Sequence, residues 1–322
     1  MDKDMKLLEV KDLTVHYITY DGTVCAVENL SLHLNHGETL GLVGETGAGK
    51  TTTAKAIMGL LPQPPAKVMS GNIIFEGQDI LNKPESELEK IRGNKISMVF
   101  QDPMTSLNPV ISVGKQIEEV ILLHQDIERN TVVNKAKEML ELVGIPAERA
   151  SDFPHQFSGG MRQRVVIAMA LACNPKLLIA DEPTTALDVT IQAQILDLME
   201  GLKTKYNTST IMITHDLGVV ADICDKIAVI YAGNVVEYAD KFTLFTKPQH
   251  PYTIGLFNCI PDIYSEEKRL TPIKGLMPDP TNLPKGCRFW PRCPNAKEIC
   301  SQKEPPVAEI ESNHFIKCHL FS

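Results

Sequence analysis

Residues 44–51 read Gly44-Glu45-Thr46-Gly47-Ala48-Gly49-Lys50-Thr51, which fits the phosphate-loop pattern G-x-x-x-x-G-K-[ST]. The loop follows a short apolar run, Thr39 to Val43, typical of a buried strand, and precedes TTTAKAIMGLL, which has helical character. Glycines let backbone N–H groups turn toward phosphate oxygens, and the following helix adds positive partial charge at its N-terminus. The order strand, loop, helix therefore predicts a nucleotide phosphate site.

Within this loop, Lys50 can reach the β- and γ-phosphates of a nucleotide, and Thr51 can place a hydroxyl on Mg²⁺. The next residue, Thr52, lies in the first turn of the expected helix. The predicted nucleotide-binding residues of this segment are Gly44, Glu45, Thr46, Gly47, Ala48, Gly49, Lys50, Thr51 and Thr52.

A second segment carries the acids that such a site needs. LLIADEP predicts a buried strand, Leu177 to Ala180, that ends in Asp181 and Glu182. Asp181 can hold Mg²⁺ through water, and Glu182 is then placed to orient an attacking water. Taken alone, Glu182 would more often be an exposed loop acid, but the phosphate loop in the same chain favours the catalytic role.

The rest of the pattern indicates an α/β protein. Period-two alternation in LLEVKDLTVHYITY, broken at Lys11-Asp12, and again in AVENLSLHL predicts an antiparallel entry sheet. Apolar residues at helical spacing predict helices, and the strands alternate with them, which favours a parallel sheet covered on both faces. The expected helices are Glu85 to Ile91, Val113 to His124, Val132 to Leu142, Arg162 to Cys173 and Ile191 to Leu202, and further strands are Ile96 to Phe100 and Ile211 to Thr214.

The chain has 322 residues with 40 Asp+Glu against 32 Lys+Arg, a formal net charge of −8. This balance disfavours a nucleic-acid partner, because nucleic-acid-binding proteins usually present a basic surface. The sequence shows neither an uncharged apolar run long enough to span a bilayer nor a signal-type N-terminus, so we expect a cytosolic protein. Disulfides are rare in that compartment, which leaves the eight cysteines to be explained.

Between the two nucleotide segments, Phe157-Ser158-Gly159-Gly160-Met161 resembles the LSGGQ signature of ABC-type ATPases, with Met161 where the general signature has Gln. A serine and two glycines opening a helix make a second anion site. The resemblance implies that two ATPase subunits dimerise head to tail, so that Ser158, Gly159, Gly160 and Met161 close over the nucleotide of the partner subunit.

Further elements of the family follow in order. Gln101 matches the Q-loop glutamine and implies a contact with Mg²⁺, and Ala186-Leu187-Asp188 matches the D-loop. His215, at the end of an expected strand, matches the switch histidine that contacts the γ-phosphate. The resemblance thus names Glu182, His215 and Gln101 as catalytic. The aromatic residue that stacks on adenine matches Tyr17 best, with Tyr20 as the alternative.

A narrower resemblance comes from four motifs: FQDPMTSLNP (100–109), FPHQFSGGMRQRV (153–165), HPYT (250–253) and GCRFWPRCP (286–294). They are similar to ATPase subunits of dipeptide and oligopeptide importers, over about residues 5–320. The resemblance implies a motor subunit that hydrolyses ATP on the cytoplasmic face of the cell membrane. Its implied partners are a second, related but non-identical ATPase, two transmembrane permease subunits and, indirectly, an extracytoplasmic peptide-binding protein.

The implied fold is an α/β P-loop ABC-type ATPase with an antiparallel β subdomain, a RecA-like parallel-sheet core, a helical subdomain and a small proline-rich C-terminal module. We place the nucleotide-binding domain at residues 5–240, with the helical subdomain at about 102–172, and the C-terminal module at 241–322. The proline distribution supports this division, since 11 of the 21 prolines lie at or beyond Pro248.

Four cysteines lie close together in that module: Cys287, Cys293, Cys300 and Cys318. Four thiolates suit Zn²⁺ or an iron–sulfur cluster, although the spacing has no C-x₂-C pair of the zinc type. The importer resemblance implies a [4Fe–4S] cluster, with Zn²⁺ as the alternative and with His314 and His319 as alternative ligands. We expect such a centre to supply folding energy to a segment with little regular structure.

Two alternatives stay open. Importers of nickel or other small solutes share most of these motifs, and the ATPase does not contact the cargo. Soluble ABC proteins of DNA repair or translation are the second alternative, but they usually fuse two ATPase halves or insert long coiled coils, and this chain shows neither.

Overall fold

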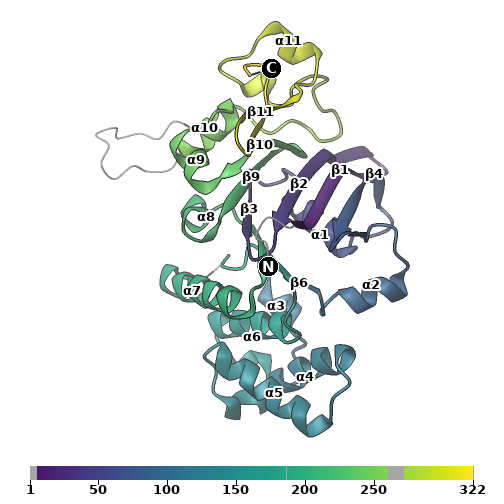
Figure 1. The fold of residues 1–322 in the computed structure, drawn as a ribbon, viewed down its shortest axis with the longest axis vertical. Coiled ribbons are helices and arrows are strands. Elements are labelled where there is room, and N and C mark those ends of the chain that lie inside the picture. The colour runs from purple at the N-terminus through teal and green to yellow at the C-terminus, as the bar shows by residue number, and fades with distance from the viewer. Residues whose placement is uncertain (1–5, 186, 260–271, 322) are drawn as a thin grey trace. The chain divides into compact units, whose positions relative to one another are not determined.

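A computed structural model of the chain describes residues 6–185, 187–259 and 272–321 (Figure 1). The chain divides into two compact units. Unit 1 takes in residues 35–38 and 82–212, and unit 2 takes in residues 6–34 and 39–81 together with the described residues from 213 onward. The predicted phosphate loop belongs to unit 2, and Asp181 and Glu182 belong to unit 1.

Unit 2 begins with a four-stranded sheet in the order β2-β1-β4-β5, formed by β1 (Lys6–Thr19), β2 (Gly22–Asn35), β4 (Ala66–Phe75) and β5 (Gln78–Asp79). Strand β1 pairs antiparallel with β4, and β4 with β5. Its residues Leu8 and Val10, and then Leu13 and Val15, are buried, as the alternation predicts. The register shifts just after Lys11, where the apolar pattern breaks.

A second set of strands in unit 2 runs in the order β11-β12-β10-β9-β3. These are β3 (Thr39–Val43), β9 (Lys226–Tyr231), β10 (Asn234–Asp240), β11 (Val307–Glu311) and β12 (His314–Lys317). Strand β3 pairs parallel with β9, and the pairs β9–β10, β10–β12 and β11–β12 are antiparallel. Figure 1 shows the yellow C-terminal strands continuing this sheet beside β10.

The short helices of unit 2 connect these strands. They are α1 (Lys50–Met58), α8 (Leu217–Ile223), α9 (Lys241–Thr246), α10 (Pro251–Phe257) and α11 (Glu298–Gln302), with the 3₁₀ turn η3 (Trp290–Arg292). The C-terminal region therefore has regular structure of its own, contrary to the expectation drawn from its proline content.

A buried carboxylate fixes this C-terminal region to β10. Glu237 has no exposed surface, and its oxygens accept the backbone N–H groups of Gln249 and His250 at 2.8 and 2.9 Å. Nε2 of His314 on β12 lies 2.8 Å from the same carboxylate. A buried carboxylate needs such partners. These hydrogen bonds therefore fix the positions of the start of α10 and of strand β12.

Unit 1 carries the other nucleotide segment. Its strands β6 (Ile96–Val99), β7 (Leu177–Asp181) and β8 (Ser209–Ile213) lie in the order β8-β7-β6, and β6 pairs parallel with β7. Its helices are α2 (Glu85–Ile91), α3 (Pro103–Ser106), α4 (Val113–His124), α5 (Arg129–Leu142), α6 (Gly159–Leu171) and α7 (Val189–Tyr206), with the 3₁₀ turns η1 (Ala147–Ser151) and η2 (Pro154–Gln156).

The helices α4, α5 and α6 pack on one another (Figure 1), and each buries apolar side chains. Helix α4 buries Val113, Ile117 and Ile121, which follow the helical period that the sequence shows. The antiparallel sheet, the parallel strand pairs and this helical part confirm the expected α/β class. Among the described residues, none of the helices has the length and apolar character needed to cross a bilayer.

His250 makes the stability of unit 2 depend on pH. Its ring is 1% exposed, Nδ1 accepts the N–H of Tyr252 at 3.0 Å, and Nε2 has no partner among the described residues. Burial lowers the pKa of His250 from 6.5 to about 3. Between these two values the unfolded chain binds a proton that the folded chain does not, so stability falls as pH drops through this window.

We predict that the free energy of unfolding falls by about 1.4 kcal/mol per pH unit below pH 6.5 because of this one group. His250→Asn keeps an acceptor at the helix N-cap but does not titrate. Urea unfolding at pH 7.5, 6.5 and 5.5 should therefore give wild type a steeper pH dependence than His250→Asn. Equal slopes would show that the imidazole is not protonated selectively in the unfolded chain.

Candidate functional site

The phosphate loop lies between the fully buried strand β3 and helix α1, as the sequence predicts. Gly44, Gly47 and Gly49 have φ of 153°, 83° and 103°, which L side chains rarely adopt. A Cβ on Gly44 would lie 2.1 Å from the carbonyl oxygen of Ile230, and one on Gly49 would lie 2.4 Å from that of Ala26. Only glycine fits these two positions, so the loop backbone is held close to the neighbouring strands.

Helix α1 presents its N-terminus without a competing acid. Gly49 provides no side-chain cap, and the first turn holds no acidic residue. The N–H groups of the first turn point out of this end of the helix, and together with the helix dipole they favour an anion here. Lys50 is buried, and its ammonium donates to the carbonyl oxygens of Gly44 and Glu45 at 2.6 and 3.0 Å. This geometry fits a phosphate group, because the lysine and the helix amides gather at one loop.

The remaining residues of the segment surround this end of the helix. Ala48 is buried, and its N–H donates to Glu45 O at 3.1 Å, whereas Thr46 and Gly47 are exposed. The hydroxyl of Tyr17 lies 3.4 Å from Oγ1 of Thr52. Tyr20, the alternative for stacking on adenine, is fully exposed at the turn after β1. The position of Tyr17 beside α1 supports the first choice.

The C-terminal region holds the loop through Glu45. Two guanidinium nitrogens of Arg292 donate to the two carboxylate oxygens of Glu45, each at 3.0 Å. The N–H of Glu45 donates to the hydroxyl of Tyr252 at 2.9 Å, and Arg292 also donates to the hydroxyl of Tyr231 at 3.3 Å. Burial alone would lower the pKa of Arg292, but the bonds to Glu45 and Tyr231 outweigh it and raise the pKa. The arginine is therefore a permanent cation beside the phosphate loop.

The residues that bond to Glu45 belong to two motifs, HPYT and GCRFWPRCP. Both motifs resemble the peptide-importer ATPases specifically and are not part of the general ABC signature. Tyr231, Tyr252 and Phe289 pack their rings 4.6–5.4 Å apart around the ion pair. Sequence reasoning misses the link between Glu45 and Arg292, because 247 residues separate them. The one sequence feature that could have indicated this link is that HPYT and GCRFWPRCP each place polar side chains beside aromatic residues.

In unit 1, strand β7 ends in Asp181, which is buried, and Glu182, which has φ 48°. The Glu182 carboxylate accepts the side-chain amide of Gln101 and the hydroxyl of Thr185, both at 2.9 Å. The structure thus brings together Gln101 and Glu182, which the sequence assigns to catalysis. Carboxylate and amide oxygens, which Asp181, Glu182 and Gln101 carry, are donors of the type that Mg²⁺ prefers.

The signature residues open helix α6 of unit 1. Ser158 is the N-cap and accepts the N–H of Met161 at 3.4 Å, and the first turn has no acid. A Cβ on Gly160 would lie 2.5 Å from Cγ2 of Ile191 in α7, so a glycine is needed there. Asp188 caps α7 by accepting the N–H of Ile191 at 3.0 Å. Gly159 lies in the first turn, and Ala186 of the D-loop lies outside the described residues.

His215 follows strand β8 and is exposed. It precedes Asp216, which caps helix α8 by accepting the N–H groups of Gly218 and Val219 at 2.8 and 3.4 Å. The histidine that the sequence matches to the switch position therefore directly precedes a capped helix start.

The four C-terminal cysteines lie near one another. Burial raises the pKa of Cys287 to about 11, and the neighbouring thiols of Cys318, Cys300 and Cys293 add to the shift. Yet no three of these sulfurs, all in the described chain, lie within 4.8 Å of one another, whereas thiolates around one zinc are about 3.8 Å apart. Of the two alternative ligands, His314 is bonded to Glu237, and Nε2 of His319 lies 2.8 Å from Lys303 O.

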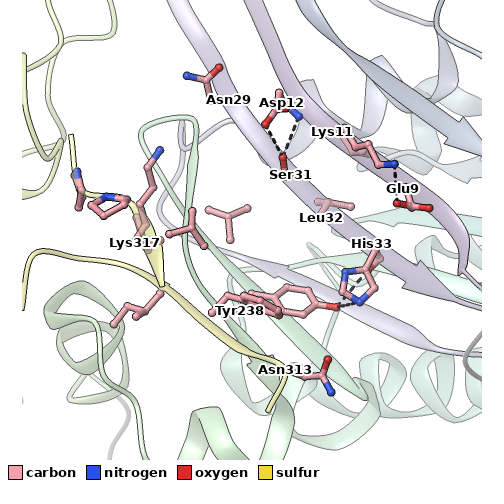
Figure 2. Close-up of a pocket in the computed structure, with 18 of the residues that line it drawn as sticks. Glu9, Lys11, Asp12, Asn29, Ser31, Leu32, His33, Tyr238, Asn313 and Lys317 are labelled. Atoms are coloured by element: carbon pink, nitrogen blue, oxygen red, sulfur yellow. Dashed lines mark hydrogen bonds and ion pairs between the residues drawn. The ribbon is translucent and has the colours of Figure 1, made fainter. Parts of the chain in front are cut away.

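A cavity of about 790 Å³ lies elsewhere in unit 2, between the sheet of β1 and β2 and the strands β10 and β12 (Figure 2). Its polar side chains bond to one another, as Figure 2 shows for Asp12 with Ser31 and for Tyr238 with His33. The predicted nucleotide-binding residues do not line it. The cavity is therefore separate from the candidate site.

Comparison with known proteins defines the family. A family model described as "ABC transporter" matches residues 27–185, and one described as "Oligopeptide/dipeptide transporter, C-terminal region" matches residues 236–300. The oligopeptide transport ATP-binding protein OppD of Bacillus subtilis (strain 168) is 54% identical over 98% of this chain and 89% of its own. OppD of Escherichia coli (strain K12) is 52% identical over 97% and 92%. The dipeptide transport ATP-binding protein DppD of Bacillus subtilis (strain 168) is 49% identical over 98% and 95%.

Solved structures agree. A dimeric, post-hydrolysis ATP-binding cassette bound to ADP and Pi has a TM-score of 0.66 and 28% identity, over 73% of this chain and 98% of its own. CbiO1 of Clostridium perfringens, part of an ABC transporter complex, has a TM-score of 0.65 and 27% identity, over 78% and 95%. The chain therefore belongs to the ABC transporter ATPases, among the oligopeptide and dipeptide transport ATP-binding proteins. The predicted ABC-type fold and the predicted ATPase class are confirmed.

The same comparisons contradict the predicted iron–sulfur cluster. The relatives are described as ATP-binding proteins and not as iron–sulfur proteins, and no cluster is evidenced at Cys287, Cys293, Cys300 and Cys318. The prediction is wrong, and so is its physical basis, because Glu237 and the strands β11 and β12 already order this region.

We predict that Arg292→Ala weakens ATP binding about tenfold, or about 1.4 kcal/mol. The change leaves the Glu45 carboxylate unpaired beside the site of the phosphates, where it repels them. Arg292→Lys keeps the charge but not the two parallel bonds, so an intermediate loss is expected. Titration calorimetry with a non-hydrolysable ATP analogue measures the effect, with the thermal midpoint as a check of folding. An unchanged dissociation constant in folded Arg292→Ala would contradict the assigned role.

Proposed function

We propose that this chain is the ATP-hydrolysing motor subunit of a membrane importer for oligopeptides or dipeptides. The observation that carries the proposal is the combination in one chain of an ABC nucleotide segment and the oligopeptide/dipeptide transporter C-terminal region. The descriptions of the relatives, oligopeptide and dipeptide transport ATP-binding proteins, favour peptides over nickel or another solute as cargo.

The nucleotide roles follow from the chemistry of each group. We assign phosphate binding to the backbone of residues 44–49, to Lys50 and to Thr52, and stacking on adenine to Tyr17. Thr51, Gln101 and Asp181 would hold Mg²⁺, which when bound screens the negative charge of the β- and γ-phosphates. Hydrogen bonds to Lys50 and the α1 amides orient the phosphate chain.

We assign to Glu182 the role of orienting the attacking water. Its carboxylate is oriented by the amide of Gln101 and the hydroxyl of Thr185, and it can accept a hydrogen bond from water through its remaining lone pairs. His215 would donate a hydrogen bond to the γ-phosphate. The bonds that orient the Glu182 carboxylate and the exposure of the His215 imidazole support these two assignments.

The exposed N-terminus of α6 supports a role in a dimer. Ser158, Gly159, Gly160 and Met161 would bind the γ-phosphate held by a second ATPase subunit, with Asp188 at the same interface. One solved relative is a dimeric cassette, which supports this arrangement. We propose a related, non-identical ATPase as the partner.

Transport across a bilayer needs further subunits. We propose that two permease subunits form the pore, that this chain binds them from the cytoplasmic face, and that an extracytoplasmic peptide-binding protein delivers the cargo. We keep the division into a nucleotide-binding domain at 5–240, with a helical subdomain at about 102–172, and a C-terminal module at 241–322. The contacts of Arg292 and Tyr252 with Glu45 of the phosphate loop support a role of that module in nucleotide binding, exerted through Glu45.

We predict that Glu182→Gln binds ATP but hydrolyses it at least 100-fold more slowly, because an amide cannot accept the proton of the attacking water. ATP turnover and retained nucleotide are measured on the purified protein with its partner ATPase. Glu141→Gln, the same chemical change at an exposed position on α5, is the control.

Cells that carry Glu182→Gln should also lose uptake of a labelled tripeptide, with nickel uptake unchanged, whereas Glu141→Gln cells take up both. Near-normal ATP turnover in Glu182→Gln would refute the catalytic assignment. Loss of nickel uptake with intact peptide uptake would refute the peptide cargo and leave the ATPase assignment standing.

A further inference from the structure

Three side chains of metal-ligand type meet on the first hairpin of unit 2: His16 on β1, and Cys25 and Glu28 on β2. Sγ of Cys25 lies 3.0 Å from Nε2 of His16 and 3.5 Å from an oxygen of Glu28. All three ligand atoms lie within 4.8 Å of one another, and each side chain is half-buried. The phosphate loop and the catalytic acids do not include any of these residues.

The backbone explains why the three meet. Strand β1 ends at Thr19 and β2 begins at Gly22, so a two-residue connection places His16 opposite Cys25 on the neighbouring strand. Glu28 is three residues beyond Cys25 and would face the other side of a regular strand. The strand is irregular here, with Asn29 at φ 49°, and the Glu28 carboxylate lies on the side of Cys25.

We propose that Nε2 of His16, Sγ of Cys25 and the carboxylate of Glu28 form a Zn²⁺ site. Bonds of about 2.3 Å to sulfur and about 2.0–2.1 Å to nitrogen and oxygen, at the tetrahedral angle, separate neighbouring donor atoms by about 3.5 Å. Two of the three separations, 3.0 and 3.5 Å, agree with this value to within about half an ångström, and the third, between His16 and Glu28, is within 4.8 Å. Rotations of these side chains can therefore bring the three atoms to the distances of a zinc site.

The donor set selects the metal. Imidazole, thiolate and carboxylate together suit Zn²⁺, whereas Mg²⁺ and Ca²⁺ take oxygen ligands. On binding, the Cys25 thiol loses its proton to solvent and its sulfur forms the bond to zinc. The thiolate and the carboxylate then balance the two positive charges of the ion.

A cavity of about 270 Å³ gives the metal a route and a fourth position. It is lined by Cys25 and Glu28 and by residues of the segment 280–288, among them Lys285 and Arg288. Three protein ligands leave one tetrahedral position for a water from this cavity. Two of the three ligands, Cys25 and Glu28, line this cavity, which gives the ion a path for exchange.

Arg288 orients one of the ligands from outside. A guanidinium nitrogen of Arg288 donates to Glu28, and another donates to the carbonyl oxygen of Ala232. A carboxylate has lone pairs for both an arginine and a metal, and such outer bonds fix the direction of a metal ligand. The N–H of Cys25 donates to Pro280 O at 2.9 Å, so the bound ion would connect both hairpin strands to the C-terminal region.

The test is the number of zinc equivalents that the purified chain binds, measured by equilibrium dialysis and atomic spectrometry. Wild type should bind one equivalent more than Cys25→Ser and than His16→Asn, because each variant removes one ligand. Cys259→Ser, a half-buried cysteine outside the cluster, should bind as wild type does. Cys287, Cys293, Cys300 and Cys318 are unchanged in all these chains, so any zinc on them cancels.

A second measurement needs no variant. Zinc should slow alkylation of Cys25 by iodoacetamide at least tenfold, as mapped by mass spectrometry, and should leave the rate at Cys259 unchanged. Equal zinc stoichiometry in wild type and folded Cys25→Ser would overturn the proposal. An alkylation rate at Cys25 that does not respond to zinc would overturn it as well, whether or not the variants fold.

Discussion

The bidentate ion pair between Arg292 and Glu45 is the interaction that connects the parts of unit 2. The arginine side chain is only 7% exposed, so its charge is stabilised mainly by its bonds to the Glu45 carboxylate and the Tyr231 hydroxyl. Because Glu45 is a residue of the phosphate loop, the position of the loop depends on a side chain from the far end of the sequence. The nucleotide segment and the transporter-specific C-terminal region thus form one structural element within the unit.

Glu237 makes that connection possible. A fully buried carboxylate that binds two backbone N–H groups and a histidine leaves little freedom for the segment around His250 or for strand β12. The aromatic rings of Tyr231, Tyr252 and Phe289 then fill the space between this network and Arg292. The proline-rich region is thus ordered by buried polar bonds and sheet pairing within the described residues.

Local patterns were sufficient for much of the fold. The bounds of α2 and α4 coincide with the expected ranges because their apolar spacing ends where the helices end, and the phosphate loop is recognisable from its glycines. Strand β4 could not be predicted from local patterns, because prolines precede it and Gly71 interrupts it at a register shift. Strands β11 and β12 escape them because their order depends on Glu237, and no local rule links Arg292 to Glu45. The clustered cysteines led to the wrong prediction of an iron–sulfur cluster, because their spacing shows only that the thiols are near one another in sequence and not that they bind a cofactor.

A double-mutant cycle on ATP affinity tests most directly whether the C-terminal region acts on the nucleotide through this ion pair. The dissociation constant of ATP is measured for wild type, Arg292→Ala, Glu45→Ala and the double variant. If Arg292 acts through Glu45, removing Glu45 from Arg292→Ala restores affinity to within about threefold of Glu45→Ala alone, because no unpaired carboxylate remains to repel the phosphates. Two losses that simply add in free energy would contradict it, since Arg292 would then act on ATP independently of Glu45.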